Sequence, residues 1–315
     1  MSTTTDRVAL STLPFQSESA SSLPATSDGM QHSIAAPAVV NGFGFWSGKD
    51  VRVEFRPAPA GSGVSFVRTD LSTPVRIPAK VDCRIEVPRR TTLSHKSVTV
   101  EMVEHVLAAL AGLGIDNCEI WVDQSELPGC DGSSLPFVNA LIKAGIVAQS
   151  EPRPQLFVRE VTRVGNADQW IEARPAEGVL SIRYRLDYSG TSTAIGRQTN
   201  EFVVTPQVFR TQLASSRTFM LEEEAKWLLA QGLGTRVKPT DVLVFGDSGP
   251  IENEQRFEDE CVRHKILDVI GDLALGGCQV VGAIVAHRSG HRLNAELVRA
   301  LLTEGEIVKP QRKTA

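Results

Sequence analysis

The sequence predicts an α+β fold made of two similar domains, each with a sheet and helices. Its 315 residues exceed the roughly 100 to 200 residues of one domain. Each half places a run of strand-like segments before helical ones, which is the order typical of α+β proteins. A pattern at residues 53–58 recurs at 171–176, and each copy is followed by a glycine and a second alternating segment. These matches favour an internal duplication, although strand-rich chains can also produce them by chance.

The composition excludes several classes of protein. Hydrophobic residues make up 42% and charged residues 22%, as in ordinary globular proteins. The net charge is 33 − 37 = −4, which gives no reason to expect nucleic acid as a partner. No apolar stretch reaches the 18 residues or so of a transmembrane helix. The 5 cysteines form no Cys-x-x-Cys pair, so we expect a cytoplasmic protein without a disulfide framework.

The N-terminal half begins with residues 1–30, which we expect to be a disordered leader because they lack the features of a secretory signal. The first domain is predicted at 31–150. Alternating residues at 51–55 and 64–67 flank a turn-rich segment and predict a hairpin. Apolar spacing predicts a helix at 100–113, then a strand at 120–122 and a helix at 136–144. The prolines and charges of residues 149–154 are typical of an interdomain linker.

The second domain is predicted at 151–305, followed by a tail at 306–315. Residues 180–186 alternate like a strand. Helices are expected at 222–231 and 257–275, and a continuous buried strand at 280–286.

The helix at 257–275 has an unusual polar stripe. His264, Asp268 and Asp272 follow one another at intervals of four residues, so they lie on one face. Neutral imidazole and carboxylate are common zinc ligands. From this helix alone, a solvent-exposed face with a His/Asp pair is favoured over a metal site, because it is the simpler interpretation.

The helix at 100–113 offers a third ligand. Glu104 and His105 lie on a stripe distinct from its apolar face. Three protein ligands with an open fourth position are typical of a catalytic zinc site, and Glu104 could then act as general base. The alternative is that both residues are merely exposed, because the sequence contains no His-Glu-x-x-His motif.

Two further segments carry candidate residues. His291 lies in a predicted glycine-containing turn at 289–294, from which it could act as general acid. Thr218 precedes the helix at 222–231 and could offer a hydroxyl or amide to an oxyanion. A Ser/Thr cluster before a helix is more often a capping signal.

Taken together, six blocks of sequence resemble the UDP-3-O-acyl-N-acetylglucosamine deacetylases, the zinc amidases that commit Gram-negative bacteria to lipid A synthesis. The blocks occur in the order of that family between about residues 42 and 302. They are Val103 to Asn117, Asp131-Gly132-Ser133, Ser216-Arg217-Thr218-Phe219, Arg256 to Glu260, Arg263 to Asp268, and Ser289 to Asn294.

The resemblance implies a two-domain α+β fold with the active site between the domains. By position, it implies three zinc ligands: His105, His264 and Asp268. Glu104 would activate water, while His291 would stabilise the oxyanion and protonate the leaving amine. Asp272 would orient His291, and Thr218 would share the oxyanion with zinc. Ferrous iron can use the same ligands, so the metal is left open.

The resemblance also implies substrate contacts. Lys265 and Phe219 would touch the acylated UDP-amino-sugar substrate, and Tyr188 aligns with an aromatic position that stacks on uracil. Arg288 stands where the family has a lysine near the diphosphate. We expect a monomer with at most transient contact with a membrane surface.

Three departures from the family pattern bear on specificity. Trp46 replaces a histidine, Met220 replaces a small residue, and residues 234–237 replace paired glycines. By the resemblance, Trp46 would alter contacts with the sugar or phosphate, whereas Met220 and residues 234–237 lie in loops that flank the family's acyl passage, so the acyl length is open. Two alternatives therefore remain: a same-fold amidohydrolase for another acylated nucleotide sugar, and a catalytically weak paralogue that only binds.

Overall fold

A computed structural model describes residues 29–308. Residues 1–28 of the predicted leader and 309–315 of the predicted tail lie outside the described residues. Both predicted boundaries shift, because Met30 already belongs to strand β1 (Met30–Ile34) and the chain continues into strand β21 (Glu306–Val308). Strand β1 pairs with β10 (Ile146–Pro152), and β21 pairs with β11 (Gln155–Phe157). Most of the predicted linker is therefore strand.

Two five-stranded sheets share one topology, which confirms the two similar α+β domains. The N-terminal sheet has the order β2-β3-β9-β4-β5 and the C-terminal sheet the order β12-β13-β20-β14-β15. In each, the central strand runs parallel to the fourth and antiparallel to the second. The N-terminal strands are β2 (Ala38–Phe43), β3 (Asp50–Pro57), β4 (Val64–Arg68), β5 (Val75–Pro78) and β9 (Cys118–Val122). The C-terminal strands are β12 (Thr162–Gly165), β13 (Trp170–Arg174), β14 (Ser181–Asp187), β15 (Arg197–Val203) and β20 (Ala283–His287).

The predicted hairpin at residues 51–67 is wrong. Its two strands form as expected, but β9 lies between β3 and β4 and pairs with both. Cys118, Ile120 and Val122 of β9 are all fully buried, so this apolar strand takes the centre of the sheet. A local pattern predicts a strand but does not identify its partner.

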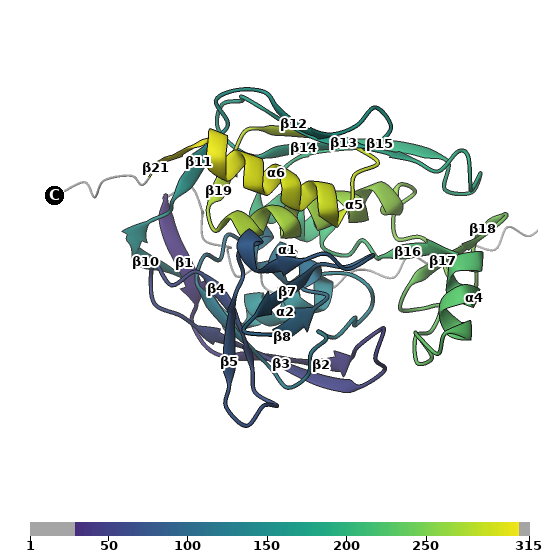
Figure 1. The fold of residues 1–315 in the computed structure, drawn as a ribbon, viewed down its shortest axis with the longest axis horizontal. Helices are drawn as coiled ribbons and strands as arrows, with labels where there is room; N and C mark the ends of the chain where they lie inside the picture. Colours follow the sequence, from purple (N-terminus) through teal and green to yellow (C-terminus); the bar gives the residue numbers. More distant parts are fainter. Residues whose placement is uncertain (1–28, 309–315) are drawn as a thin grey trace, which may run out of the picture.

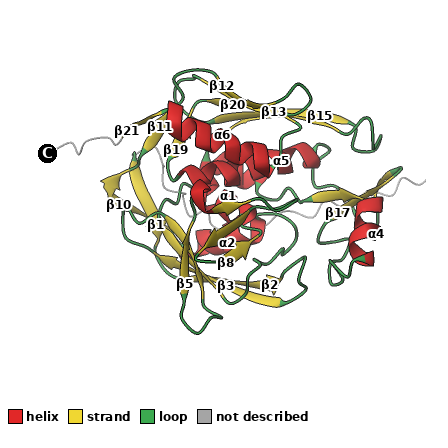
Figure 2. Ribbon diagram, in the orientation of Figure 1, coloured by secondary structure: helices red, strands yellow, loops and turns green. Residues whose placement is uncertain are grey.

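Four helices lie between the two sheets (Figures 1 and 2). They are α1 (Glu104–Leu113), α2 (Leu135–Ala144), α5 (Glu260–Leu273) and α6 (His291–Glu304). Helix α1 is shorter than predicted because residues 98–101 form strand β8 (Val98–Glu101). The predicted strand at 280–286 is broken at Gly282 into β19 (Gln279–Val281) and β20. A Cβ at Gly282 would lie 2.7 Å from Val158, so the chain passes too closely for a larger residue there.

Each domain carries an insertion between the last edge strand of its sheet and the helix that follows: between β5 and α1 in the first domain, and between β15 and α5 in the second. The first insertion contains β6 (Arg84–Ile85), β7 (Thr92–His95) and β8, preceded by a 3-10 turn at Val81–Cys83. The second contains α3 (Pro206–Val208), β16 (Phe219–Leu221), α4 (Glu222–Ala230), β17 (Leu243–Gly246) and β18 (Gly249–Pro250), with a π turn at Phe209–Leu213 after α3. Figure 1 shows α4 and its strands projecting from the body of the molecule. In the described part of the chain, no helix has the length and apolar character needed to cross a membrane.

Candidate active site

The polar stripes of α1 and α5 face each other in the interior. His105, His264 and Asp268 each offer one ligand atom, and these atoms lie within 4.8 Å of one another. Oδ1 of Asp268 is 3.4 Å from Nε2 of His264 and 3.8 Å from Nε2 of His105. All three residues are at most 4% exposed, so the solvated-face interpretation is wrong. Local periodicity identified the stripe, but packing between the domains buries it.

The donor atoms fit a divalent metal ion. Burial lowers the pKa of His105 to about 3 and also lowers the pKa of His264, so both imidazoles are neutral. Burial opposes ionisation of Asp268, but its interactions with the neighbouring His264 and with the Lys265 ammonium outweigh burial and hold the pKa of this carboxyl well below its usual range. Oδ1 of Asp268 is buried without a hydrogen-bond partner among the described residues. Two neutral imidazoles and such an oxygen form a typical zinc donor set.

Neighbouring groups fix the orientation of these ligands. Nδ1 of His264 donates a hydrogen bond to the carbonyl oxygen of Ser216 at 3.0 Å, which leaves its Nε2 facing Asp268. Nζ of Lys265 donates to the other oxygen of Asp268 at 2.7 Å. Contacts of this kind set the tautomer and direction of metal ligands.

Glu104 lies beside this cluster at the first turn of α1. Its carboxyl group is buried and accepts a hydrogen bond from the backbone N–H of Thr91 at 3.0 Å. Burial raises the pKa of Glu104 to about 7, and the nearby charge of His291 opposes the rise only in part. A carboxyl group with a pKa near neutrality is suited to accepting a proton.

His291 forms a second acid–base group. It is the first residue of α6 rather than part of a turn, and its Nδ1 donates to Oδ2 of Asp272 at 2.8 Å. Burial opposes protonation of His291, but the charge and hydrogen bond of Asp272 outweigh it and raise its pKa to about 9. The carboxylate of Asp272 in turn accepts hydrogen bonds from the hydroxyl of Thr91 (2.6 Å) and from the side-chain amide of Asn294 (2.8 Å).

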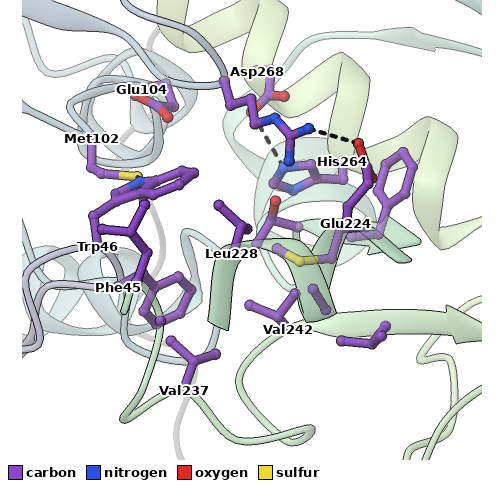
Figure 3. A pocket seen from close by; sticks show the side chains of 18 of the residues that line it. Phe45, Trp46, Met102, Glu104, Glu224, Leu228, Val237, Val242, His264 and Asp268 are labelled. Atoms are coloured by element: carbon purple, nitrogen blue, oxygen red, sulfur yellow. Dashed lines mark hydrogen bonds and ion pairs between the residues drawn. The ribbon is translucent and has the colours of Figure 1, made fainter. Parts of the chain in front are cut away.

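The metal-binding group, Glu104 and His291 line one cavity of about 610 Å³. Figure 3 shows Glu104, His264 and Asp268 at one end and apolar side chains at the other. The lining includes the predicted residues Glu104, His105, Tyr188, Thr218, Phe219, His264, Lys265, Asp268 and His291. Asp272 is fully buried behind His291. Arg288 is exposed and is not among the lining residues.

The aromatic residues lie together on the cavity wall. The rings of Tyr188 and Phe219 are 5.7 Å apart, edge to face. Nζ of Lys265 is 5.8 Å from the centre of the Phe219 ring. Arg89 of the first insertion donates to Glu224 of α4 at 2.9 Å, which joins the two insertions at the cavity.

The residues that depart from the expected pattern also line the cavity: Trp46, Met220, Gly234 and Val237. Nε1 of Trp46 donates to the sulfur of Met102 at 3.3 Å. Arg236 donates to the carbonyl oxygen of Gly48 (2.6 Å) and to Asp50 (2.8 Å), which ties the segment 234–237 to the N-terminal domain.

Sequence reasoning missed Thr91, Ser216 and Asn294 as supports of the site. Thr91 contacts both Glu104 and Asp272, which are 13 and 181 residues away. Neither separation corresponds to a short sequence motif, so neither contact could be recognised from the sequence. Ser216 and Asn294 lie inside the recognised blocks, so their position there was the available signal.

The geometry supports metal-assisted hydrolysis of an amide or ester. Three donors converge on one point, a buried carboxyl and a protonated imidazole lie beside it, and the same cavity extends over apolar side chains.

Comparison with known proteins identifies the family. The family model for UDP-3-O-acyl N-acetylglycosamine deacetylase matches residues 31–303. The UDP-3-O-acyl-N-acetylglucosamine deacetylase of Actinobacillus succinogenes is 38% identical over 279 residues, covering 88% of this chain and 91% of the relative. The enzyme of the same name from Pasteurella multocida is 38% identical over 280 residues, with the same coverage. That of Shewanella oneidensis is 36% identical over 276 residues, covering 87% and 90%. The chain therefore belongs to the UDP-3-O-acyl-N-acetylglucosamine deacetylase family.

Proposed function

We propose that this protein hydrolyses the acetamide of UDP-3-O-(3-hydroxyacyl)-N-acetylglucosamine, releasing acetate and the free amine, as the committed step of lipid A biosynthesis. One observation carries the proposal: the metal-binding group, Glu104 and His291 line a single cavity. Family membership supplies the substrate class.

His105, His264 and Asp268 hold the metal ion, which is zinc or ferrous iron. When bound there, the metal polarises the amide carbonyl and lowers the pKa of water. The low pKa of His105 and the lowered pKa of His264 keep both imidazoles available as ligands. Lys265 neutralises the Asp268 oxygen that is not needed for the metal.

Glu104 and His291 divide the proton transfers. Glu104 takes a proton from the attacking water as the new C–O bond forms, and its buried position keeps competing solvent away. His291 is protonated because of Asp272, so it donates a hydrogen bond to the developing oxyanion. When the C–N bond breaks, His291 gives its proton to the leaving amine.

The remaining lining residues hold the substrate. Thr218 donates to the oxyanion, while Lys265 and Phe219 contact the sugar region. Tyr188 stacks on the uracil, and its edge-to-face contact with Phe219 supports a fixed ring position. Arg288 contacts the diphosphate from outside the cavity. The apolar side chains around Leu228 and Val242 receive the acyl chain.

We also propose two domains close to the predicted ranges 31–150 and 151–305. The first begins at Met30 and ends with β10 at Pro152, and the second extends through β21 to Val308. The protein acts as a cytoplasmic monomer with transient contact with the membrane surface, where an acylated substrate partitions.

The direct test is to incubate metal-loaded protein with UDP-3-O-(3-hydroxyacyl)-N-acetylglucosamine of several chain lengths, with and without a chelator. Acetate release is followed by mass spectrometry. Chelator-sensitive release is the expected result. Release only from another acylated nucleotide sugar would support an altered substrate, to which Trp46 and Met220 in the lining would contribute. Binding of substrate and metal without any release would indicate a binding paralogue.

A further inference from the structure

One peptide group is held from both sides by helix α5. The carbonyl oxygen of Ser216 accepts a hydrogen bond from Nδ1 of His264 at 3.0 Å. The N–H of Arg217, in the same peptide group, donates to Oε1 of Glu260 at 2.9 Å. A trans peptide points its C=O and N–H in opposite directions. Glu260 and His264 are four residues apart, or about 6 Å along the helix axis, so one planar group bridges one helical turn.

The carboxylate of Glu260 is itself firmly held. It is fully buried, and its oxygens also accept from Nε of Arg217 (2.9 Å), from Nη2 of Arg217 (3.1 Å) and from the N–H of Arg256 (2.6 Å). The remaining guanidinium contacts of Arg217 go to Asn253 (2.9 Å) and to the carbonyl oxygen of Glu254 (2.6 Å). A buried ion pair with all its hydrogen bonds made has one geometry and resists displacement.

We propose that Glu260 is a positioning residue for the metal ligand His264 and acts through the peptide between Ser216 and Arg217. The inference rests on the metal-binding role proposed above. The acceptor for His264 is a backbone carbonyl, so the direction of the imidazole depends on whatever fixes that peptide. Glu260 and Arg217 fix it, and thereby direct Nε2 of His264 toward Asp268.

The same peptide also leads directly into Thr218. The N–H of Thr218 donates to the carbonyl oxygen of Gly132 at 2.8 Å, and its side chain lines the cavity. A rotation of the preceding peptide would therefore disturb both a metal ligand and a residue at the reacting end of the cavity. Loss of the Glu260 contact should change metal affinity and turnover more than substrate affinity.

The test is Glu260→Gln, which preserves shape and removes the charge. Zinc alone is the probe, and its dissociation constant is measured by competition with a chromophoric chelator. We expect zinc binding about 10- to 100-fold weaker, as is typical when a group supporting a metal ligand is removed. With zinc at saturation, kcat should fall while KM changes little.

Asp116→Asn is the matched control. Asp116 pairs with the buried Arg153 at 2.8 Å and is not among the residues that line the cavity. The Asp116 carboxylate is itself partly exposed (21%), so the variant tests the effect of weakening the partner of a buried arginine. Thermal unfolding of both variants shows whether they lose comparable stability, and the control should bind zinc with the affinity of the unsubstituted protein.

The proposal is overturned if folded Glu260→Gln binds zinc within twofold of the unsubstituted protein, or if the control weakens zinc binding equally. If Glu260→Gln does not fold, Arg217→Lys is measured by the same criterion. That variant retains a positive charge but lacks the planar fork. Failure of the unsubstituted protein to bind zinc would instead refute the metal site, and the positioning role with it.

Discussion

Gly271 of α5 lies against the backbone of Glu104 at the start of α1. A Cβ at position 271 would stand 2.2 Å from the carbonyl oxygen of Glu104, well inside van der Waals contact. Asp268 and Asp272 flank this glycine on α5, and His105 follows Glu104 on α1. The close approach of these two backbones therefore sets the distance between His105 and Asp268, two of the proposed metal ligands, which come from different domains.

Gly271→Ala should push the two helices apart. Overpacking of this kind costs about 1–3 kcal/mol of stability, and we expect weaker zinc binding because His105 moves away from Asp268. Urea unfolding and zinc titration measure the two effects. Gly190→Ala is the control, since a Cβ there has no atom within 4 Å. Unchanged zinc affinity in Gly271→Ala would show that this contact does not set the geometry of the site.

The helices and their polar stripes could be predicted because helical periodicity is a local property of the sequence. The spacing of His264, Asp268 and Asp272 places them on one face whatever surrounds the helix. Their burial could not be predicted from α5 alone. It depends on α1, which reaches the same place from the other domain and contributes His105.

Contacts between distant segments account for what the sequence did not reveal. The strands at 51–55 and 64–67 were identified, but the insertion of β9 between them depends on a segment about 50 residues further on. Thr91 holds both Glu104 and Asp272, although no motif contains it. The family resemblance supplied roles for individual residues, and the geometry added the groups that support them.

Glu104→Gln should reduce turnover by about 10²- to 10⁴-fold, the usual contribution of a general base. The amide keeps the shape of the side chain but cannot take the proton. Zinc content should remain that of the unsubstituted protein, because Glu104 is not one of the three proposed ligands. Acetate release and metal analysis test both expectations.

Glu172→Gln is the matched control, since Glu172 is another buried carboxyl group but is not among the residues that line the cavity. It should retain normal turnover. Loss of zinc from Glu104→Gln would contradict the assignment and identify Glu104 as a ligand or a structural residue.

Asp272→Asn should change the pH dependence of turnover. In the proposed mechanism His291 acts while protonated, and Asp272 raises its pKa to about 9, so activity should fall as the pH rises through about 9. Burial disfavours the protonated form of His291, and the Asp272 charge is the main interaction that offsets this effect. Removing that charge leaves the effect of burial largely unopposed. The pKa of His291 should therefore fall, and the alkaline decline should move to lower pH.

The measurement is kcat/KM against pH for both proteins, with zinc at saturation. An alkaline limb that stays in place in Asp272→Asn would exclude His291 as its origin. In His291→Gln the decline assigned to this group should disappear altogether, together with most of the activity.

Trp46→Ala should shift the preferred acyl chain to greater length. Trp46 lies between Met102 and Phe45 on one wall of the cavity, and its indole N–H is tied to the Met102 sulfur (Figure 3). Removing the ring widens the cavity beside its apolar end. Each additional buried methylene contributes about 0.8 kcal/mol, or about fourfold in kcat/KM. When substrates of increasing acyl length are compared, kcat/KM of Trp46→Ala should therefore reach its maximum at a longer chain than kcat/KM of the unsubstituted protein.

Trp121→Ala provides the control for loss of a tryptophan. Trp121 lies on β9, where Arg56 stacks on its ring at 3.5 Å, and it is not among the residues that line the cavity. Its chain-length profile should match that of the unsubstituted protein. If Trp46→Ala lowers all rates by one common factor, Trp46 does not discriminate between acyl chains, because a widened apolar cavity must favour long chains over short ones.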